Sequence, residues 1–414
     1  MAATAGEQLG LYVSIPFCRS KCTYCNFASG VYPASEHARY VERLINEMRG
    51  ARKWSENLRA ELPTSVDTIY LGGGTPSLLE PNLIAQLFGA IRAEFLIDPD
   101  VEITVECAPG QIADTTLAAL VQVGVNRVSL GVQSFIDREA QQSGRLHSRA
   151  IVLEDLKRLR AAGISNLNVD LIAGLADQTF ASWEKSVSVL VESGASHASI
   201  YMLEVDEDSR LGRELLSGGA RYHAGLVPGD DTIARMYEHV IERLVVAGLL
   251  QYEISNFARP GFESRHNLRY WQRRPYLGIG LDASSMLRGS RDAGEDPQLG
   301  YVLRFTTTDD LKAYLEGPQR PQTAWLSVDR QHEEAWFLGL RMNSGVSVSA
   351  LGREFGSQMV APAVEVVKHL SDRGLLTFDG ETARLTGQGR MLSNDVFQEF
   401  LEIAPLHPRL ATQS

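Results

Sequence analysis

The sequence predicts an α/β protein in two parts: an open, partial (βα)6 barrel of the TIM type, followed by a smaller winged-helix-like α+β domain. Three observations lead to this prediction. Strand and helix patterns alternate over the first two thirds of the 414 residues, which is typical of a parallel sheet. About six such units are present, whereas a closed barrel needs eight. From about Gln331 the alternation gives way to helices and one short hairpin.

The predicted strands of the barrel are short segments rich in β-branched and other apolar residues. In chain order they cover residues 11–15, 66–71, 102–106, 127–132, 167–172 and 197–203. Polar or glycine-rich residues follow most of these strands directly. Because the carboxyl ends of parallel strands meet at one rim of the sheet, we expect these residues to lie close together.

Helices are predicted between the strands from apolar residues spaced three and four apart. One helix begins near Ser35, whose hydroxyl is suited to cap it. Pro81 opens the next helix, because proline is favoured in a first helical turn. Another helix follows Thr179 and ends at Gly194, since glycine readily adopts the left-handed backbone of a helix end.

The C-terminal part has a different order of elements. Helices are expected over 331–342, 348–356 and 361–373, then two short strands around Asp379-Gly380 and a last helix through Leu401. Helices followed by a hairpin are typical of a winged-helix domain. A polar, glycine-rich stretch over 288–300 separates this part from the barrel. We therefore expect a core domain over 1–290, a connection over 291–330 and a C-terminal domain over 331–414.

The composition is that of an ordinary globular protein and disfavours several classes of function. No apolar run approaches the ~20 residues of a membrane span, and the N-terminus lacks the basic start and apolar core of a signal peptide. A net charge of −11 disfavours binding to nucleic acid, while transient contact with a membrane surface stays open. Only four cysteines occur, which favours the reducing cytoplasm over a disulfide framework.

Cys18, Cys22 and Cys25 form a CxxxCxxC motif directly after the first predicted strand. Three thiolates supply three of the four ligands that an iron–sulfur cubane normally takes, so one iron is left open to an exchangeable ligand. Zinc is the alternative, but it favours paired Cys or Cys/His spacings and needs a fourth ligand nearby. The fourth cysteine, Cys107, is expected to be a small buried residue, because strand alternation points it away from Glu106.

Further motifs accompany the cysteines in a fixed order along the chain. They read LYVSIPFC at 11–18, GGGTPS at 72–77, VECAPG at 105–110, GVQSF at 131–135, GRLH at 144–147, NVDLIAGLADQT at 168–179, YEISNF at 252–257 and HNLRYW at 266–271. With these motifs the chain resembles the radical S-adenosylmethionine (SAM) superfamily over nearly its whole length. Within the superfamily it resembles the group that contains anaerobic coproporphyrinogen oxidase and the heme chaperone HemW.

The resemblance implies a [4Fe–4S] cluster on the three cysteines, with SAM chelating the open iron. The SAM contacts that it implies are Tyr12, Gly73, Gly74, Thr75, Glu106, Gln133, Arg145 and Asp170. The residue types suit this role, because carboxylates and an amide can bind the amine and the ribose hydroxyls, and arginine can bind the carboxylate. Each residue alone would be better explained by a tight turn or a structural salt bridge. As a set at successive strand ends, they favour SAM binding.

Two departures from the oxidase pattern favour the chaperone branch. The oxidase branch has the motif CxxxCxxCxC, with one more cysteine two positions after the third. In this chain Phe27 occupies that position. They also carry a substantial segment before the cluster, for which the early position of Cys18 leaves no room. We therefore do not expect turnover of coproporphyrinogen, although cleavage of SAM stays open.

The HNLRYW run also resembles the chaperone branch, where its histidine is implicated in heme binding. Imidazole is a common axial ligand of heme iron, so His266 is expected to be a heme ligand. A lone histidine more often makes local hydrogen bonds, and this is the alternative. The sequence thus predicts a cytoplasmic protein that binds a cluster, SAM and heme and passes heme to acceptor proteins. The alternatives are an oxygen-independent coproporphyrinogen III oxidase and another radical SAM enzyme, such as a methylase.

Overall fold

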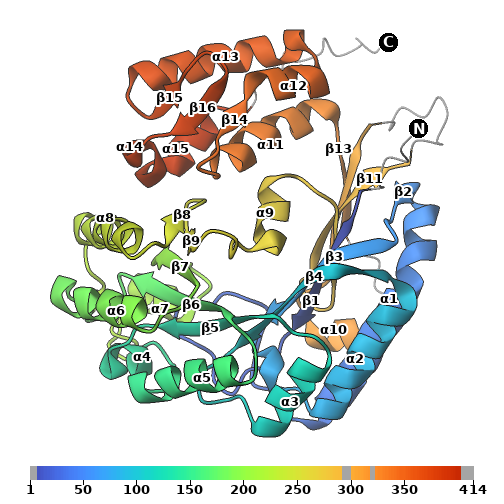
Figure 1. Cartoon of the computed structure of the whole chain (residues 1–414), viewed down its shortest axis with the longest axis vertical. Coiled ribbons are helices and arrows are strands. Elements are labelled where there is room, and N and C mark those ends of the chain that lie inside the picture. Colours follow the sequence, from blue (N-terminus) through green and yellow to red (C-terminus); the bar gives the residue numbers. More distant parts are fainter. Residues whose placement is uncertain (1–6, 291–299, 318–321, 402–414) are drawn as a thin grey trace.

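A curved sheet with helices along its outer side forms the larger part of the protein, and a small domain stands over one end of it (Figure 1). The computed structural model describes residues 7–290, 300–317 and 322–401. The strands of the large sheet are β1 Leu9–Ile15, β2 Ala60–Glu61, β3 Ser65–Gly73, β4 Leu96–Cys107, β5 Arg127–Gln133, β6 Asn166–Ala173, β7 His197–Met202, β8 Leu250–Gln251, β9 Asn256–Ala258, β10 Tyr276–Ile279, β11 Ser284–Gly289, β12 Val302–Thr306 and β13 Gln322–Leu326.

The helices of the larger part connect these strands. They are α1 Ser35–Asn57, α2 Pro81–Glu94, α3 Asp114–Gln122, α4 Asp137–Gln142, α5 Arg149–Ala161, α6 Phe180–Glu192, α7 Arg210–Ser217, α8 Asp230–Val246, α9 Arg265–Trp271 and α10 Leu311–Glu316.

Six strands, β1, β3, β4, β5, β6 and β7, pair side by side in parallel, which confirms the prediction of six βα units. Strand β10 adds to β1 in parallel, and β11, β12 and β13 continue that edge in antiparallel pairs. At the other edge β9 and β8 pair antiparallel. Within the described residues the sheet runs from β13 to β8 without joining its ends, so it is an open barrel.

The two faces of the parallel strands differ in polarity. Outward side chains such as Val13, Val105 and Leu130 are fully buried against the helices. Inward positions carry polar residues instead, among them Thr68 and Ser129. Parallel sheets are usually apolar on both faces. The polar inward face here therefore marks the interior of the open barrel as a place for ligands.

Two sequence-based expectations about local structure were wrong. Ser35 is the first residue of α1 and does not cap it; the preceding Ala34 occupies the cap position without a side-chain hydrogen bond. Backbone carbonyls of Pro33 and Ala34 accept from the first helical N–H groups, so no side-chain cap is needed there. The last helix is also broken at Leu392, and it ends before Leu401.

Much of the stretch predicted as a connection is part of the large sheet. Residues 302–326 contain β12, α10 and β13, and β12 pairs with β11 and with β13. Apolar residues of this stretch, including Leu303 and Phe305, join the core of the barrel, which explains why it is folded. Residues 291–299, from the polar stretch, lie outside the described residues.

The C-terminal domain has its own hydrophobic core. Its elements are α11 Val328–Leu340, β14 Val346–Ser347, α12 Val348–Phe355, α13 Ser357–Asp372, β15 Leu376–Phe378, β16 Thr382–Leu385, α14 Gly387–Met391 and α15 Ser393–Gln398. Trp336 and Phe400 stack in the middle of this core, with ring centroids 5.2 Å apart. The three strands form a separate sheet in the order β14-β16-β15. The predicted winged-helix-like arrangement is therefore observed.

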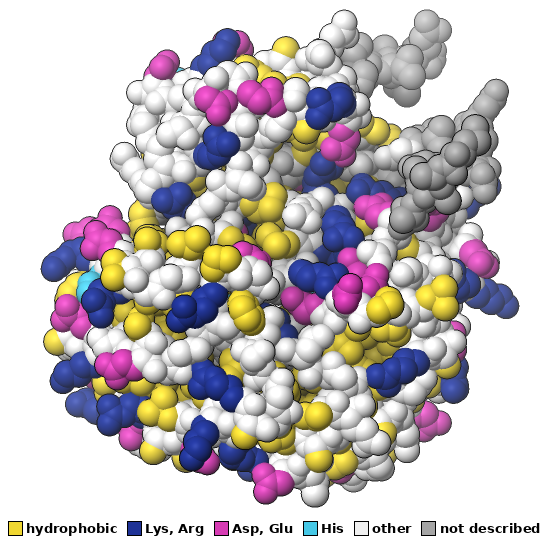
Figure 2. All heavy atoms as spheres, viewed as in Figure 1, with side chains coloured by type: hydrophobic (Ala, Val, Ile, Leu, Met, Phe, Trp, Pro, Cys, Tyr) yellow, Lys and Arg dark blue, Asp and Glu magenta, His cyan; other side chains and the backbone are white. Residues whose placement is uncertain are grey.

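The YEISNF run attaches this domain to the barrel. The Ile254 N–H donates to the carbonyl of Arg341, and the Asn343 N–H donates to the carbonyl of Tyr252. On the face seen in Figure 2, acidic and basic side chains are interspersed, and apolar side chains gather where the two parts meet. Among the described residues, no helix combines the length and the apolar character that a membrane crossing needs.

Candidate functional site

The three predicted cluster ligands lie on one loop between β1 and α1. A backbone bridge closes this loop at its base, where the Cys18 N–H donates to the carbonyl of Gly30 over 2.9 Å. Cys22 is buried, whereas Cys18 and Cys25 are partly exposed, and all three thiols are free. Burial raises the pKa of the Cys18 thiol, so binding of a metal centre there would release a proton.

The glycine-rich end of β3 is pinned against this loop. Gly74 donates its N–H to the carbonyl of Ile15, and the Thr75 N–H donates to the carbonyl of Phe17. A Cβ on Gly74 would lie 2.7 Å and 2.8 Å from these two carbonyl oxygens, so no larger residue fits. Glycine is therefore required here because two backbone segments meet.

A second loop holds the cysteines from the other side. The Thr23 N–H donates to the carbonyl of Ser143, just before the GRLH run. Gly144 has a φ of +91°, and a Cβ on it would lie 3.1 Å from Cys22 Cα. The cysteine loop is thus held between the end of β3 and the loop after α4.

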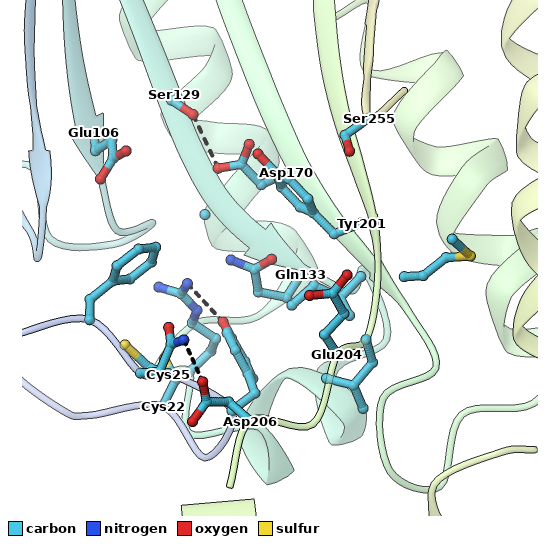
Figure 3. A pocket seen from close by; sticks show the side chains of 18 of the residues that line it. Cys22, Cys25, Glu106, Ser129, Gln133, Asp170, Tyr201, Glu204, Asp206 and Ser255 are labelled. Atoms are coloured by element: carbon cyan, nitrogen blue, oxygen red, sulfur yellow. Dashed lines mark hydrogen bonds between the residues drawn. The ribbon is translucent and has the colours of Figure 1, made fainter. Parts of the chain in front are cut away.

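The cysteines share one large cavity with most of the predicted SAM contacts. Its volume is about 1160 Å³, which is above the range of ~300–1,000 Å³ that is typical of small-molecule pockets. The predicted residues that line it are Cys18, Cys22, Cys25, Gly73, Gly74, Thr75, Glu106, Gln133, Arg145 and Asp170. Figure 3 shows the Asp170 and Gln133 side chains on the sheet side of the cavity, with the loop that carries Cys22 and Cys25 on the opposite side. The strands and the cysteine loop thus face each other across the cavity.

Glu106, at the end of β4, is held by two hydrogen bonds. Tyr70 donates its hydroxyl to Oε1 over 2.8 Å, and the Gly73 N–H donates to Oε2 over 3.2 Å. Burial raises the pKa of the Glu106 carboxyl to about 7, although the hydrogen bond from Tyr70 opposes this shift. The carboxylate can therefore accept a hydrogen bond from a ligand amine, and its charge changes near neutral pH.

Asp170, on β6, is oriented by a polar network inside the barrel. Its two carboxylate oxygens accept from the Ser129 hydroxyl over 3.1 Å and from the Asn168 amide over 2.6 Å. Burial raises the pKa of Asp170, and hydrogen bonds from Ser199, Asn168 and Ser129 oppose that shift. A carboxylate fixed in this way suits the paired hydroxyls of a ribose.

Gln133 and Arg145 also line the cavity, and Gln133 does so through an unusual backbone conformation. Gln133 has a φ of 67°, which is rare for a residue with a side chain, and it sits at a register shift between β5 and β6. Such bulges redirect side chains next to binding sites. Arg145 donates to the Tyr24 hydroxyl over 3.0 Å, while its buried Nε has no protein partner. Arg145 lines the cavity, and its guanidinium group suits a ligand carboxylate.

Two predicted residues do not line the cavity. The Tyr12 hydroxyl lies behind the end of β3, 3.4 Å from the position of a Cβ on Gly73. His266, in α9, is 1% exposed, and both ring nitrogens are hydrogen-bonded, Nδ1 to the Thr68 hydroxyl at 2.9 Å and Nε2 to the Tyr270 hydroxyl at 2.8 Å. In this structure His266 therefore makes local hydrogen bonds, which is the alternative given above. To ligate heme iron, the ring would have to give up one of these two hydrogen bonds.

Sequence reasoning missed several side-chain contacts at the site. Tyr70 orients Glu106, Ser129 orients Asp170, and Tyr24 contacts Arg145. The alternating polar positions of the strands were a signal for Ser129.

Cys107 is buried as expected, and burial raises the pKa of its thiol to about 12. Among the described residues, no group of three His, Cys, Asp or Glu side chains is arranged to hold a single metal ion.

Comparisons with known proteins extend the geometric description. A family model described as the radical SAM superfamily matches residues 12–190, and one described as the HemN C-terminal domain matches residues 326–392. A heme chaperone HemW from Lactococcus lactis is 34% identical over 94% of this chain and 96% of its own length. A heme chaperone HemW from Bacillus subtilis is also 34% identical, over 94% of this chain and 98% of its own length.

A solved structure has the same fold. The coproporphyrinogen III oxidase HemN from Escherichia coli matches with a TM-score of 0.79 and 22% identity, and the match covers 95% of this chain and 90% of that one. At this identity the likeness concerns the fold alone. It nonetheless covers both the barrel and the C-terminal domain described above.

Proposed function

We propose that this chain, which belongs to the heme chaperone HemW family of radical SAM proteins, binds a [4Fe–4S] cluster, SAM and heme and passes heme to acceptor proteins in the cytoplasm. The observation that carries the proposal is the single cavity shared by three free thiols and the polar ends of the parallel strands.

The cluster would be held by Cys18, Cys22 and Cys25. The donor set fits the group, because three thiolates leave one position open and the loop that carries them is fixed by backbone hydrogen bonds on both sides. When bound, such a cluster supplies one-electron chemistry and an iron that can take two ligand atoms of SAM. The surrounding residues orient the ligand and limit the access of water.

SAM would bind between the cysteine loop and the strand ends. The carboxylate of its methionine moiety would pair with Arg145, whose buried Nε lacks a protein partner. Glu106 and the backbone of Gly73, Gly74 and Thr75 would receive the amine, and Asp170 with Gln133 would receive the ribose. Tyr12 would act from behind Gly73 rather than from the cavity wall.

Heme would occupy the outer part of the cavity, next to the C-terminal domain. This part is lined by the apolar side chains of Met202, Leu203, Met391 and Leu392, by the cation Arg341, and also by the carboxylates of Glu204 and Asp395. A porphyrin is a flat apolar ring with acidic propionates, so it fits apolar walls and an arginine. The buried Nε of Arg341 has no hydrogen-bond partner. Ligation by His266 stays a prediction that needs its ring to move.

A heme titration of the anaerobically reconstituted protein tests the proposal. Binding is monitored by absorption spectroscopy, and we expect it to saturate near one heme per chain. Leu203→Trp, which fills the outer cavity, should weaken binding, whereas Leu215→Trp on an exposed face of α7 should not. Weak binding that is indifferent to Leu203→Trp would contradict the proposal. Detection of a decarboxylated porphyrinogen product would instead favour the oxidase alternative.

A further inference from the structure

Helix α9 packs against the half of the barrel strands that lies away from the cysteines. Two backbone N–H groups at its start, those of Arg265 and His266, donate to the Glu102 carboxylate on β4, each over 3.0 Å. The fully buried Arg269 guanidinium contacts the Asp67 carboxylate on β3. Figure 1 shows α9 between the large sheet and α11. The helix is thus fixed on the strands that end at the cavity.

His266 points from this helix into the barrel, where its ring is held in one orientation. The Thr68 and Tyr270 hydroxyls occupy its two nitrogens. Burial, with the nearby charges of Arg269 and Arg127, lowers the pKa of His266 to about 3, so the ring is neutral at physiological pH. A neutral imidazole has one donor and one acceptor nitrogen, and both are used here.

The His266 ring stacks on Tyr70, with centroids 5.2 Å apart and ring planes inclined by 30°. The Tyr70 hydroxyl in turn donates to Glu106 at the cavity. Gly72 makes this arrangement possible, because a Cβ there would lie 2.9 Å from Tyr70 Cε1 and 3.0 Å from the Glu106 carboxyl carbon. A continuous line of contacts therefore runs from α9 through Tyr70 to the wall of the cavity.

We infer that His266 is a positioning residue for the SAM site: by holding the Tyr70 ring, it fixes the Glu106 carboxylate where SAM binds. This inference rests on the proposed binding of SAM at Glu106. It gives the HNLRYW motif a role that does not require contact with heme. It also implies that His266 cannot leave its place without releasing Tyr70, since the two rings are stacked.

Three variants of the reconstituted protein separate this role from heme ligation. His266→Ala removes the ring that supports Tyr70, and Tyr70→Phe keeps the stacked ring but removes the hydroxyl that bonds Glu106. Each should weaken SAM binding about tenfold, as expected when one hydrogen bond to a charged group is lost. His266→Phe keeps an aromatic ring against Tyr70, so it should restore most of the affinity. If His266 acts by positioning alone and is not a heme ligand, heme binding should be unchanged in all three.

A pH profile of SAM affinity distinguishes positioning from a general structural effect. The Tyr70 hydrogen bond lowers the pKa of Glu106, while Asp170 and Arg145 also face this carboxyl and stay in place. In His266→Ala and in Tyr70→Phe the midpoint of the profile should therefore move to higher pH. In His266→Phe it should stay near the wild-type value.

The outcomes are separable from those of the proposed function. Failure of the wild-type protein to bind SAM, measured by calorimetry under anaerobic conditions, would overturn the proposed SAM site itself. Wild-type binding of SAM with an unchanged affinity and pH profile in His266→Ala and Tyr70→Phe would overturn only the positioning role. Loss of the heme spectrum in both His266→Ala and His266→Phe, with SAM binding intact, would assign His266 to heme.

Discussion

Replacing Glu106 with Gln changes the charge of the proposed SAM site without changing its size. Burial raises the pKa of the Glu106 carboxyl to about 7, against the opposing effect of the Tyr70 hydrogen bond. At this pKa the ionised fraction rises from about one tenth at pH 6 to about nine tenths at pH 8. Because the ionised carboxylate is the better acceptor for the SAM amine, wild-type affinity gains about tenfold, or about 1.4 kcal/mol, over this interval.

The assay is calorimetric titration of SAM into the anaerobically reconstituted protein at pH 6, 7 and 8. An α-amine titrates near the upper end of this range, so SAM itself contributes to the profile. The useful quantity is therefore the ratio of the dissociation constants of Glu106→Gln and wild type, in which that contribution cancels. We expect the ratio to rise about tenfold from pH 6 to pH 8, since Gln resembles the protonated acid.

Glu204→Gln is the matched control, because Glu204 lines the same cavity but is exposed. Its ratio to wild type should not vary with pH. A ratio for Glu106→Gln that also stays constant from pH 6 to pH 8 would refute the reasoning. In that case either Glu106 does not contact the SAM amine or its pKa lies outside this range.

Three further predictions concern the loop, the buried ion pair and stability. Gly74→Ala should abolish cluster assembly, measured as iron per chain, because its Cβ collides with two backbone carbonyls, whereas Gly89→Ala in an open position of α2 should not. Arg269→Leu breaks the buried ion pair with Asp67, so it should lower the free energy of unfolding by about 3–5 kcal/mol in denaturant titrations. As a control, Arg138→Leu removes an exposed ion pair with Asp177 and should change the free energy of unfolding by at most about 0.5 kcal/mol. The pKa of Glu106 is raised in the folded state, so the stability that its neutral form gives wild type is lost as pH rises from about 4.5 to 7. Without the cluster, the free energy of unfolding of Glu106→Gln should therefore gain up to about 3 kcal/mol over that of wild type across this pH window. A difference in unfolding free energy that is the same at all pH values would contradict this.

The barrel and most of its rim could be predicted from the sequence because both follow from local patterns. Each strand has an apolar outward face, and the helices between them show apolar spacing of three and four. Once six parallel strands are inferred, geometry brings their carboxyl ends together, so Glu106, Gln133 and Asp170 had to meet. The motif spacing added the position of the cysteine loop on the same rim.

The remaining features depend on packing between distant segments, which one sequence does not reveal. Strand β12 is recognisable only through its pairing with β11, and β13 only through its pairing with β12, so the sequence alone predicts a connection there. The sequence of α9 gives no sign that His266 points into the barrel rather than toward a ligand. Likewise, nothing local indicates that Tyr70 bonds Glu106, a residue 36 positions away on the next strand. These contacts are set by the tertiary structure and had to be observed.

Electron paramagnetic resonance of the reduced, reconstituted protein, recorded with and without SAM, tests the central claim most directly. Three thiolates at the rim of the barrel should hold one four-iron cluster with an open iron, so saturating SAM should change the cluster spectrum of wild type. Cys18→Ser should lose that signal, whereas Cys107→Ser, at a buried thiol outside the loop, should keep it and its response to SAM. A cluster spectrum that SAM leaves unchanged, or one that survives Cys18→Ser, would contradict the claim.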